Sequence, residues 1–341
     1  MSSIRDVAER ANVSLGTVSN VLNHPEVVAE ATRQRVQAVI EELGFVRNGS
    51  AHQLRAGHSH NIGLIVLDVA NPFFTEVARG AEDAANEAGY LIILCNSDDA
   101  LEKESRYLHM LEEQRTAGIL ITPVQNDVRY LQHLHKQGIA VVLLDQPSRA
   151  RGLCSVAVDD VLGGELATRH LLELGHRKIA FVSGPLSIRQ CAERRLGMQR
   201  AVTVAGLDPK QVIVDIPALT QSSSAGEKCV EQLLMHEHRP TAAFCANDLL
   251  ALGVMRGLIQ RGIKIPDEMA LIGYDDVDFS STLSPALTSI HQPKYQLGRM
   301  AAELLLQEVF EAENHKHKQI MYQPELVIRA STQSPKHVGR D

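Results

Sequence analysis

The sequence predicts an N-terminal all-α domain followed by an α/β region with two doubly wound parallel-sheet lobes. Apolar residues recur at helical spacing through the first 45 residues. From residue 61 onward, apolar strand-like runs alternate with helical stretches, and a break after residue 145 divides these runs into two sets of four or five. Runs that are apolar on both faces, with helices between them, are typical of parallel sheets covered on both sides.

Residues 4–23, IRDVAERANVSLGTVSNVLN, predict two short helices separated by a turn. Ser14 lies at the end of the turn and is a good N-cap for the second helix. This arrangement is a helix-turn-helix, the unit that places its second helix in the DNA major groove. An ordinary helical hairpin is the alternative if these residues are taken alone. A third amphipathic helix, 30–43, stops at Gly44 and completes a domain expected to span residues 1–46.

Residues 47–59 are predicted to be a linker, because they are polar and contain glycines, serines and histidines. Within them, residues 48–55 have the length of two helical turns, which is too short for a helix that is stable alone in water.

The α/β core is expected over residues 60–333, with a disordered tail at 334–341. Its first lobe is predicted at about 60–160 and 291–320, and its second at about 161–290 and 321–333. The expected strands are 62–69, 90–95, 118–122, 139–145, 155–159, 178–184, 212–216, 241–247, 269–275 and 324–330. Polar residues follow several of them, and ligands in such folds bind at the carboxyl ends of the strands.

Composition is that of an ordinary globular protein, with 44% hydrophobic and 22% charged residues. The formal net charge is −7, and the first 58 residues carry six arginines against six acids, whereas a DNA-binding domain is usually basic. This neutrality weakens non-specific phosphate attraction without removing contacts from hydroxyls, amides and helix N-termini.

No apolar run is long enough to span a membrane and the N-terminus has no apolar signal core, so a cytoplasmic, nucleoid-associated protein is expected. The five scattered cysteines indicate buried free thiols.

Several enzyme classes lose their main support. The chain has no GxGxxG after its first strand, no GxxxxGK[ST] and no GxSxG, which are typical of dehydrogenases, P-loop NTPases and α/β-hydrolases. We expect no catalytic residues and no cofactor.

Three histidine pairs are each spaced by two residues: His133/His135, His236/His238 and His315/His317. Side chains at this spacing diverge on a helix surface, where we expect these pairs to lie, so solvated surface is favoured and no metal site is predicted.

Two further motifs indicate a ligand cleft. Phe73 and Phe74 follow the first strand, and two adjacent aromatics at a helix start cannot both face one core, so at least one is expected to line the cleft and face a sugar ring. Of Arg194 and Arg195, one is expected to be a surface charge and the other to bind a ligand through its planar guanidinium. The acidic run at 275–278 is interpreted as a hydroxyl acceptor in the cleft rather than as a cation site.

At this point the motifs resemble those of the LacI/GalR family of bacterial transcription regulators. The resemblance covers positions 3 to 332 and rests on IRDVAERANVSLGTVSNVLN, NGSAHQLRAG, NPFF, LATRHLLELGHRKIAFVSGP, ANDLLALGVMR and IGYDDVDFS…LTSIHQP. It implies a homodimeric repressor that binds a near-palindromic operator in double-stranded DNA, with an effector-binding core like a periplasmic binding protein and no membrane partner.

The resemblance also implies DNA-contacting positions. Base edges are read from Leu15, Gly16 and Asn20, with Thr17, Ser19 and Asn23 as phosphate or supporting contacts. In the hinge, Leu54 matches the family's minor-groove wedge, with Ala51 beside it and Asn48 in the same segment. Gly16 departs from the family's long polar readers, and Arg47 stands where relatives often carry proline.

For the effector, the resemblance implies a site made of Phe73, Phe74, Asp145, Asp160, Arg194, Asn247, Asp275 and Gln292. Two aromatics, one arginine and several acceptors are most like a pentose site, and IHQPKYQLG and LCNSDD are similar to the family's ribose-responsive members. Ribose is therefore the first expectation, although Gln146 replaces a second arginine of ribose binders and Gln221 replaces a capping aromatic. Another sugar, a nucleoside or a purine remains the alternative effector. A sugar-binding or sugar-processing protein without a regulatory role is the remaining rival.

Overall fold

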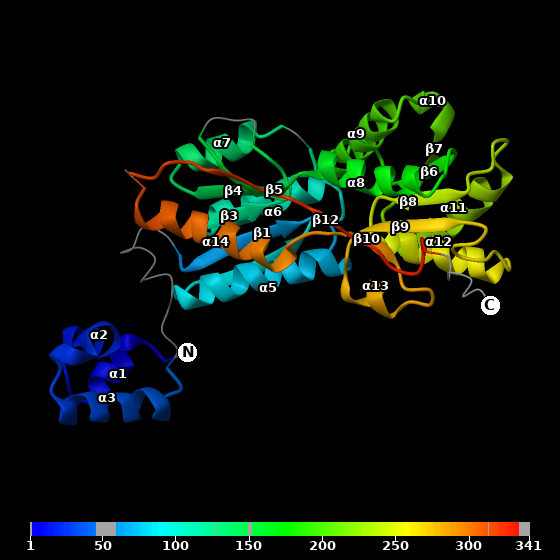
Figure 1. Cartoon of the computed structure of the whole chain (residues 1–341). Coiled ribbons are helices and arrows are strands. Elements are labelled where there is room, and N and C mark those ends of the chain that lie inside the picture. The colour runs from blue at the N-terminus through cyan, green and yellow to red at the C-terminus, as the bar shows by residue number, and fades with distance from the viewer. Residues whose placement is uncertain (1, 46–58, 126, 149–151, 313, 334–341) are drawn as a thin grey trace, which may run out of the picture. The chain divides into compact units, whose positions relative to one another are not determined.

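The computed structural model describes residues 2–45, 59–125, 127–148, 152–312 and 314–333. The chain forms two compact units, residues 1–59 and residues 60–341, each of which is described by itself (Figure 1). The hinge residues Asn48, Ala51 and Leu54, with Arg47 and the expected tail at 334–341, lie outside the described residues.

The first unit is the predicted helix-turn-helix domain. Its helices are α1 (Ile4–Arg10), α2 (Leu15–Asn23) and α3 (Glu30–Glu42), with a short 3-10 turn, η1 (Pro25–Val27), between the last two. The Ser14 side chain accepts a hydrogen bond from the Thr17 amide and caps α2, as predicted. Ser3 and Asp6 form a capping box that starts α1. Local side-chain bonds therefore set the ends of these helices.

A small apolar core holds the three helices together. Val7, Val18 and Val36 come from α1, α2 and α3 respectively, and none of them has measurable solvent exposure. Burying the apolar face of each helix is what stabilises them, because helices this short are marginal alone in water.

The second unit begins with a six-stranded sheet in the order β11-β5-β4-β3-β1-β2, all neighbours parallel. Its strands are β1 (Asn61–Val66), β2 (Leu91–Asn96), β3 (Gly118–Ile121), β4 (Ala140–Leu144), β5 (Cys154–Val158) and β11 (Gln319–Tyr322). Helices α5 (Pro72–Glu87) and α14 (Lys294–Phe310) pack on one face of this sheet, and α6 (Leu101–Glu113) and α7 (Arg129–Lys136) pack on the other. We call this layered body the first lobe.

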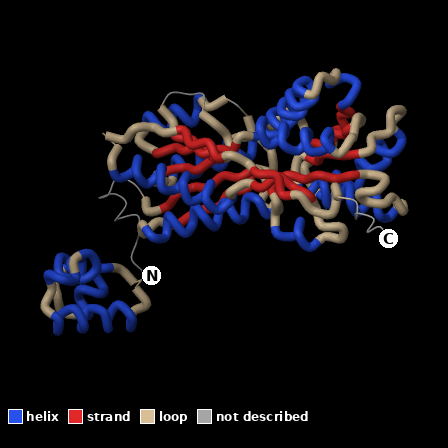
Figure 2. Tube along the Cα trace, viewed as in Figure 1, coloured by secondary structure: helices blue, strands red, loops and turns tan. Residues whose placement is uncertain are grey.

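The second lobe repeats the arrangement with the order β12-β10-β9-β8-β6-β7 (Figure 2). Its strands are β6 (Ile179–Ser183), β7 (Ile213–Pro217), β8 (Ala242–Cys245), β9 (Ala270–Asp275), β10 (Thr288–His291) and the antiparallel edge strand β12 (Glu325–Val327). Its helices are α8 (Asp160–Glu173), α9 (Arg189–Val204), α10 (Pro209–Val212), α11 (Ser223–Met235), α12 (Asp248–Gln260) and α13 (Asp278–Thr282). The fold class therefore agrees with the prediction.

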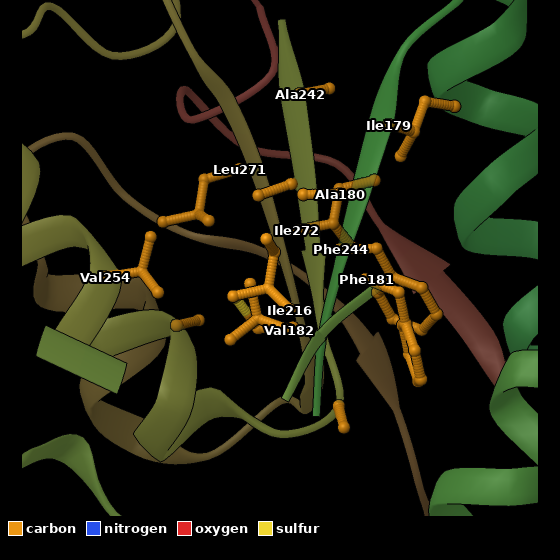
Figure 3. Close-up of a cluster of buried hydrophobic side chains, with 14 of the residues drawn as sticks. Ile179, Ala180, Phe181, Val182, Ile216, Ala242, Phe244, Val254, Leu271 and Ile272 are labelled. Carbon is orange, nitrogen blue, oxygen red and sulfur yellow. The ribbon is translucent and has the colours of Figure 1, made fainter. Parts of the chain in front are cut away.

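The core of the second lobe is apolar on both faces of its sheet. Phe181 on β6 and Phe244 on β8 lie on adjacent strands with ring centroids 5.4 Å apart (Figure 3). Both rings are almost completely buried, and Val254 of α12 belongs to the same cluster. Continuous apolar runs such as 179–182 are required because helices cover both faces.

Three details of the lobes differ from the expected boundaries. Strands β10 and β11 have four residues each, and neither was predicted. The expected boundary at 320/321 cuts through β11, which pairs along its whole length with β5, so the chain leaves the first lobe after Tyr322. The strand expected at 324–330 is shorter, at 325–327.

The five cysteines are free and buried, as expected. Among the described residues, no helix is both long enough and apolar enough to cross a membrane.

Candidate functional site

The exposed face of α2 carries the three positions expected to read bases. Leu15, Gly16 and Asn20 are exposed, and Leu15 keeps 45% of its surface accessible although it is apolar. An exposed leucine at the start of a helix is available for contact with a thymine methyl, and Asn20 for a bidentate bond to adenine. This face of α2 is the candidate DNA-reading surface.

The supporting positions are engaged inside the domain. Thr17 Oγ1 lies 2.9 Å from Ser14 Oγ, and Asn23 Nδ2 donates to the carbonyl oxygen of Ser19 at 2.8 Å. The side chains of Thr17, Ser19 and Asn23 are half-buried and stabilise the helix. Those of Leu15 and Asn20 are exposed and can reach outward.

The arginines of the domain divide into two kinds. Arg10 pairs with Glu42 at 2.6 Å and Arg33 pairs with Glu30, so these cations are partly neutralised. Arg5 and Arg35 are exposed and form no ion pair with any described residue. Although the segment is formally neutral, the two cations Arg5 and Arg35 are therefore available to bind phosphates.

A cavity lies between the two lobes of the second unit, with about 300 Å³ of empty space that includes some open solvent. Residues from both lobes surround it. They are Leu67, Asn71, Phe73, Phe74, Asp145, Gln190, Arg194, Gln221, Asn247 and Asp275.

Two buried carboxyl groups reach the cavity from the carboxyl ends of strands. Asp145 follows β4 with φ of 53°, and Asp275 ends β9 with φ of 104°, both in the left-handed region that non-glycine residues rarely adopt. Such strained backbone clusters at ligand sites, where it aims a side chain. Burial raises the pKa of Asp145 well above its usual value and raises the pKa of Asp275 to about 6.

Hydrogen bonds across the cavity join the two lobes at these carboxyl groups. Gln190 of α9 donates to the carbonyl oxygen of Asp145 at 2.8 Å and to its Oδ2 at 3.1 Å. Asn71, which caps α5, donates to Asp275 Oδ2 at 3.3 Å. Asp145 Oδ1 is buried and has no hydrogen-bond partner among the described residues. An unsatisfied buried acceptor is costly, so a donor on a ligand is favoured here.

Arg194 is the central cation of the cavity. Its Nε donates to Asp160 at 2.7 Å and its Nη1 donates to the carbonyl oxygen of Ala246. Its guanidinium carbon lies 3.6 Å from the ring centroid of Tyr274. Burial alone lowers the pKa of Arg194, but the neighbouring carboxylates, above all that of Asp160, hold it above its usual value. The guanidinium is thereby fixed in place and charged.

Tyr274 approaches Arg194 closely because Gly163 leaves space for its ring. A Cβ atom at Gly163 would lie 2.1 Å from the Tyr274 hydroxyl. That hydroxyl is buried, and its burial together with the neighbouring Asp160 carboxylate raises the pKa of Tyr274 well above its usual value.

Phe73 and Phe74 both line the cavity and both belong to the apolar core of the first lobe. Their rings are 5.0 Å apart in an edge-on arrangement, with an interplanar angle of 81°. Each ring therefore presents one part to the core and another to the cavity.

The structure brings six of the eight expected effector residues to the cavity and places two behind it. Asp160 is 3% exposed and holds Arg194, and Gln292 is fully buried and donates from Nε2 to Asp275 Oδ1 at 2.8 Å. Both orient lining groups instead of lining the cavity themselves.

Four lining residues were not in the expected effector set: Leu67, Asn71, Gln190 and Gln221. Asn71 directly precedes the phenylalanines and Gln221 had been singled out as a departure, so a signal existed for both. Gln190 lies on the helix that carries Arg194, one turn earlier, and helical spacing of four would have indicated it.

The two adjacent arginines have different surroundings, but Arg195 is half-buried rather than the surface charge that was expected. Its side chain is 15% exposed, and it binds Asp215, which is 55% exposed, at 2.6 Å, away from the cavity lining.

The fold and the site together define a class. Two parallel-sheet lobes with a ligand-sized cavity between them, joined in one chain to a helix-turn-helix domain, are the plan of a ligand-controlled DNA-binding regulator. A sequence model described as "Bacterial regulatory proteins, lacI family" matches residues 3–48, and one described as "Periplasmic binding proteins and sugar binding domain of LacI family" matches residues 59–329. The chain belongs to the LacI family.

Individual relatives cover nearly the whole chain. The HTH-type transcriptional repressor PurR of Aliivibrio salmonicida is 36% identical over 332 residues, which are 97% of this chain and 99% of the relative. A LacI family transcriptional regulator from Enterococcus faecium with bound ribose is 33% identical and superposes with a TM-score of 0.74 over 81% of this chain and 100% of its own. The lac repressor dimer bound to operator and the anti-inducer ONPF is 28% identical, with a TM-score of 0.84 over 98% of this chain and 99% of its own. This chain is a DNA-binding transcriptional repressor of that family and not an enzyme.

Proposed function

We propose that this repressor binds its operator as a homodimer in the cytoplasm and that a small ligand in the cavity between the lobes controls its affinity for DNA. The observation that carries the proposal is the cavity itself, because both lobes contribute charged and amide groups to it. A ligand that touches both lobes binds one lobe arrangement better than others, so it shifts the population toward that arrangement.

The cavity's chemistry supports a neutral ligand rich in hydroxyl groups. The carboxyl groups of Asp145 and Asp275 suit the hydroxyl groups of a ligand, and Asp145 Oδ1 has no hydrogen-bond partner among the described residues. Arg194 supplies a fixed cation, held by Asp160 and by the carbonyl oxygen of Ala246. The parts of the Phe73 and Phe74 rings that line the cavity suit the apolar face of a sugar ring.

Ribose or another sugar is therefore the first candidate effector. The ribose bound to the Enterococcus faecium regulator supports this choice.

A purine or nucleoside is the second candidate. The relatives from Aliivibrio salmonicida and Photobacterium profundum are both purine-type repressors by name, at 36% and 37% identity. The amides of Gln190, Gln221 and Asn247 each offer both a donor and an acceptor, which suits the edge of a purine base. The amides discriminate between a sugar and a purine less well than the carboxyl groups do, because amides also bind sugars.

On the DNA side, we propose that Leu15 and Asn20 contact base edges, that Gly16 contributes little direct readout, and that Thr17, Ser19 and Asn23 support the helix or contact phosphate. The hinge residues Asn48, Ala51 and Leu54 are proposed to fold together in the minor groove when two copies bind, with Leu54 as the wedge. Homodimerisation is proposed from the operator-bound lac repressor dimer.

The effector is tested by thermal unfolding of the full chain with ribose, other pentoses, hexoses, nucleosides and purine bases in parallel. A ligand that binds only the folded state raises the melting temperature by mass action. We expect a pentose to give the largest rise. A rise with a purine base and none with any sugar would replace the first candidate by the second.

Coupling to DNA is tested on fragments selected from the source genome by repeated binding to the full chain. Fluorescence anisotropy of the selected fragment, with and without the ligand found above, measures the change in operator affinity. Because coupling is reciprocal, the same fold-change must appear in ligand affinity with and without DNA. An operator affinity independent of every cavity ligand would refute control through this cavity.

A further inference from the structure

A second group of polar side chains gathers in the first lobe, away from the effector cavity. Cys154 opens β5, Glu308 lies in the last turn of α14, and His315 and His317 lie in the segment between α14 and β11. One ligand-type atom from each of these four residues lies within 4.8 Å of the other three. Cys154 pairs with Val142 of the parallel strand β4, three residues before Asp145, and does not line the cavity.

Four distances in this group are close to those of a tetrahedral metal site. Cys154 Sγ is 3.2 Å from His315 Nε2 and 3.8 Å from His317 Nδ1. Glu308 Oε2 is 3.8 Å from each of the same two nitrogens. Metal–ligand bonds of about 2.0–2.3 Å at tetrahedral angles place ligand atoms roughly 3.3–3.8 Å apart.

The surroundings leave a carboxylate with too few partners. The Glu308 side chain is 7% exposed, and its Oε2 has no hydrogen-bond partner among the described residues. The His315 side chain is only 4% exposed. A buried carboxylate is costly unless a cation compensates it.

Groups around the four side chains are placed to orient them. The Lys318 amide donates to Cys154 Sγ at 3.3 Å. His135 of α7 lies with its Nδ1 2.9 Å from Glu308 Oε1. Supporting partners of this kind fix the orientation of metal ligands.

The expectation that His315 and His317 diverge on a helix surface is wrong. They lie after the end of α14 in a segment without helical structure, and their ring centroids are 5.1 Å apart. Outside a helix, residues two apart in an extended segment point to the same side, so this pair converges where a helical pair would not.

We propose that Cys154, Glu308, His315 and His317 bind one divalent transition-metal ion of the zinc type. One thiolate, two imidazoles and one carboxylate form a ligand set that zinc accepts in proteins. Cys154 and His315 are 161 residues apart in the chain, so the ion links the segment that follows α14 to the first residue of β5. Four protein ligands make this a closed, structural site, and the ion stabilises the fold to which it binds.

The test uses the full chain, purified with a chelator, dialysed free of it and kept reduced. Zn²⁺ is titrated by calorimetry, and Co²⁺ is titrated while its absorption spectrum is recorded. We expect one equivalent of either ion, and with Co²⁺ a visible tetrahedral band together with a sulfur-to-cobalt charge-transfer band in the near ultraviolet. We also expect Zn²⁺ to raise the melting temperature of the wild-type chain.

Variants assign the ligands. Cys154→Ser is expected to abolish the charge-transfer band, and His315→Ala and His317→Ala are each expected to weaken Zn²⁺ binding at least tenfold. The matched control is the double variant His236→Ala/His238→Ala. It removes a histidine pair with the same spacing, whose rings are 6.3 Å apart and which belongs to no group of metal-ligand type among the described residues. We expect the control to bind Zn²⁺ as the wild type does.

Folding of each variant is checked by its circular dichroism and by its melting temperature in chelator, where the site has no ion in any variant. His315→Gln is a milder second substitution if His315→Ala does not fold. Less than half an equivalent of tightly bound metal in the wild type, a Co²⁺ spectrum without the sulfur band, or equal loss of binding in the control variant would each overturn the proposal.

Discussion

The buried ion pair between Arg194 and Asp160 provides the sharpest test of how the cavity is built. Asp160→Asn keeps the shape of the side chain and removes its charge. Arg194 is then a buried cation whose nearest compensating charge, 2.7 Å away, has been lost. Breaking a buried pair on one side typically costs about 3–5 kcal/mol, because the remaining charge is uncompensated.

A neighbouring pair supplies the control. Asp215→Asn removes the partner of Arg195, but the side chain of Asp215 is 55% exposed compared with 3% for that of Asp160. Pairs accessible to water contribute about 0–1 kcal/mol. The two substitutions make the same chemical change beside adjacent arginines, and the carboxylate that is changed is buried in one case and exposed in the other.

The expected difference is large enough to measure. For a domain of this size, 1 kcal/mol lowers the melting temperature by roughly 2–4 °C, so Asp160→Asn is expected to lower it by roughly 6–12 °C or more and Asp215→Asn by less than about 4 °C. Circular dichroism of the full chain without ligand measures both. Equal destabilisation by the two substitutions would refute the assignment of Asp160 as the buried partner that positions Arg194.

Three further predictions follow from single contacts. Ser14→Ala removes the N-cap of α2 and is expected to cost about 1 kcal/mol and to weaken operator binding, as measured by denaturation and anisotropy; Ser14→Thr, which keeps the hydroxyl, serves as the control. Burial raises the pKa of Asp275 to about 6, so the folded state binds this proton more tightly than the unfolded state does. The contribution of Asp275 to the free energy of unfolding therefore falls as pH rises from about 4 through 6. Asp275→Asn is expected to flatten this part of the pH–stability profile by up to roughly 3 kcal/mol and to weaken ligand binding, and an unchanged profile would contradict the burial of this carboxyl. Gly163→Ala places a methyl group 2.1 Å from the Tyr274 hydroxyl. It is expected to cost about 1–3 kcal/mol of folding stability and to lower effector affinity, which calorimetry measures. In Gly16→Ala the added methyl group meets only Ser14 Oγ at 3.7 Å, so the stability is expected to be unchanged or higher.

Much of the candidate cavity was predictable because its residues follow strands. Asp145 and Asp275 come directly after apolar runs, and parallel strands bring their carboxyl ends to one edge, so a shared cleft followed from the pattern alone. The roles of Asp160 and Gln292 did not follow, because whether a polar side chain faces the ligand or another residue depends on rotamers and packing. The structure places both behind the lining, bonded to Arg194 and Asp275.

The sequence by itself determined the features that depend on neighbouring residues. The caps at Ser3 and Ser14, the helical periodicity of the first domain and the two-sided apolar strands are all local, and they were sufficient to predict the class of fold. Tertiary structure alone decided contacts between distant segments. The pairing of β11 with β5, and the convergence of His315 and His317 on Cys154 and Glu308, join positions more than 150 residues apart, and they arise because α14 returns the chain to the first lobe. No local pattern encodes such a meeting, since it depends on where the whole core allows the chain to pass.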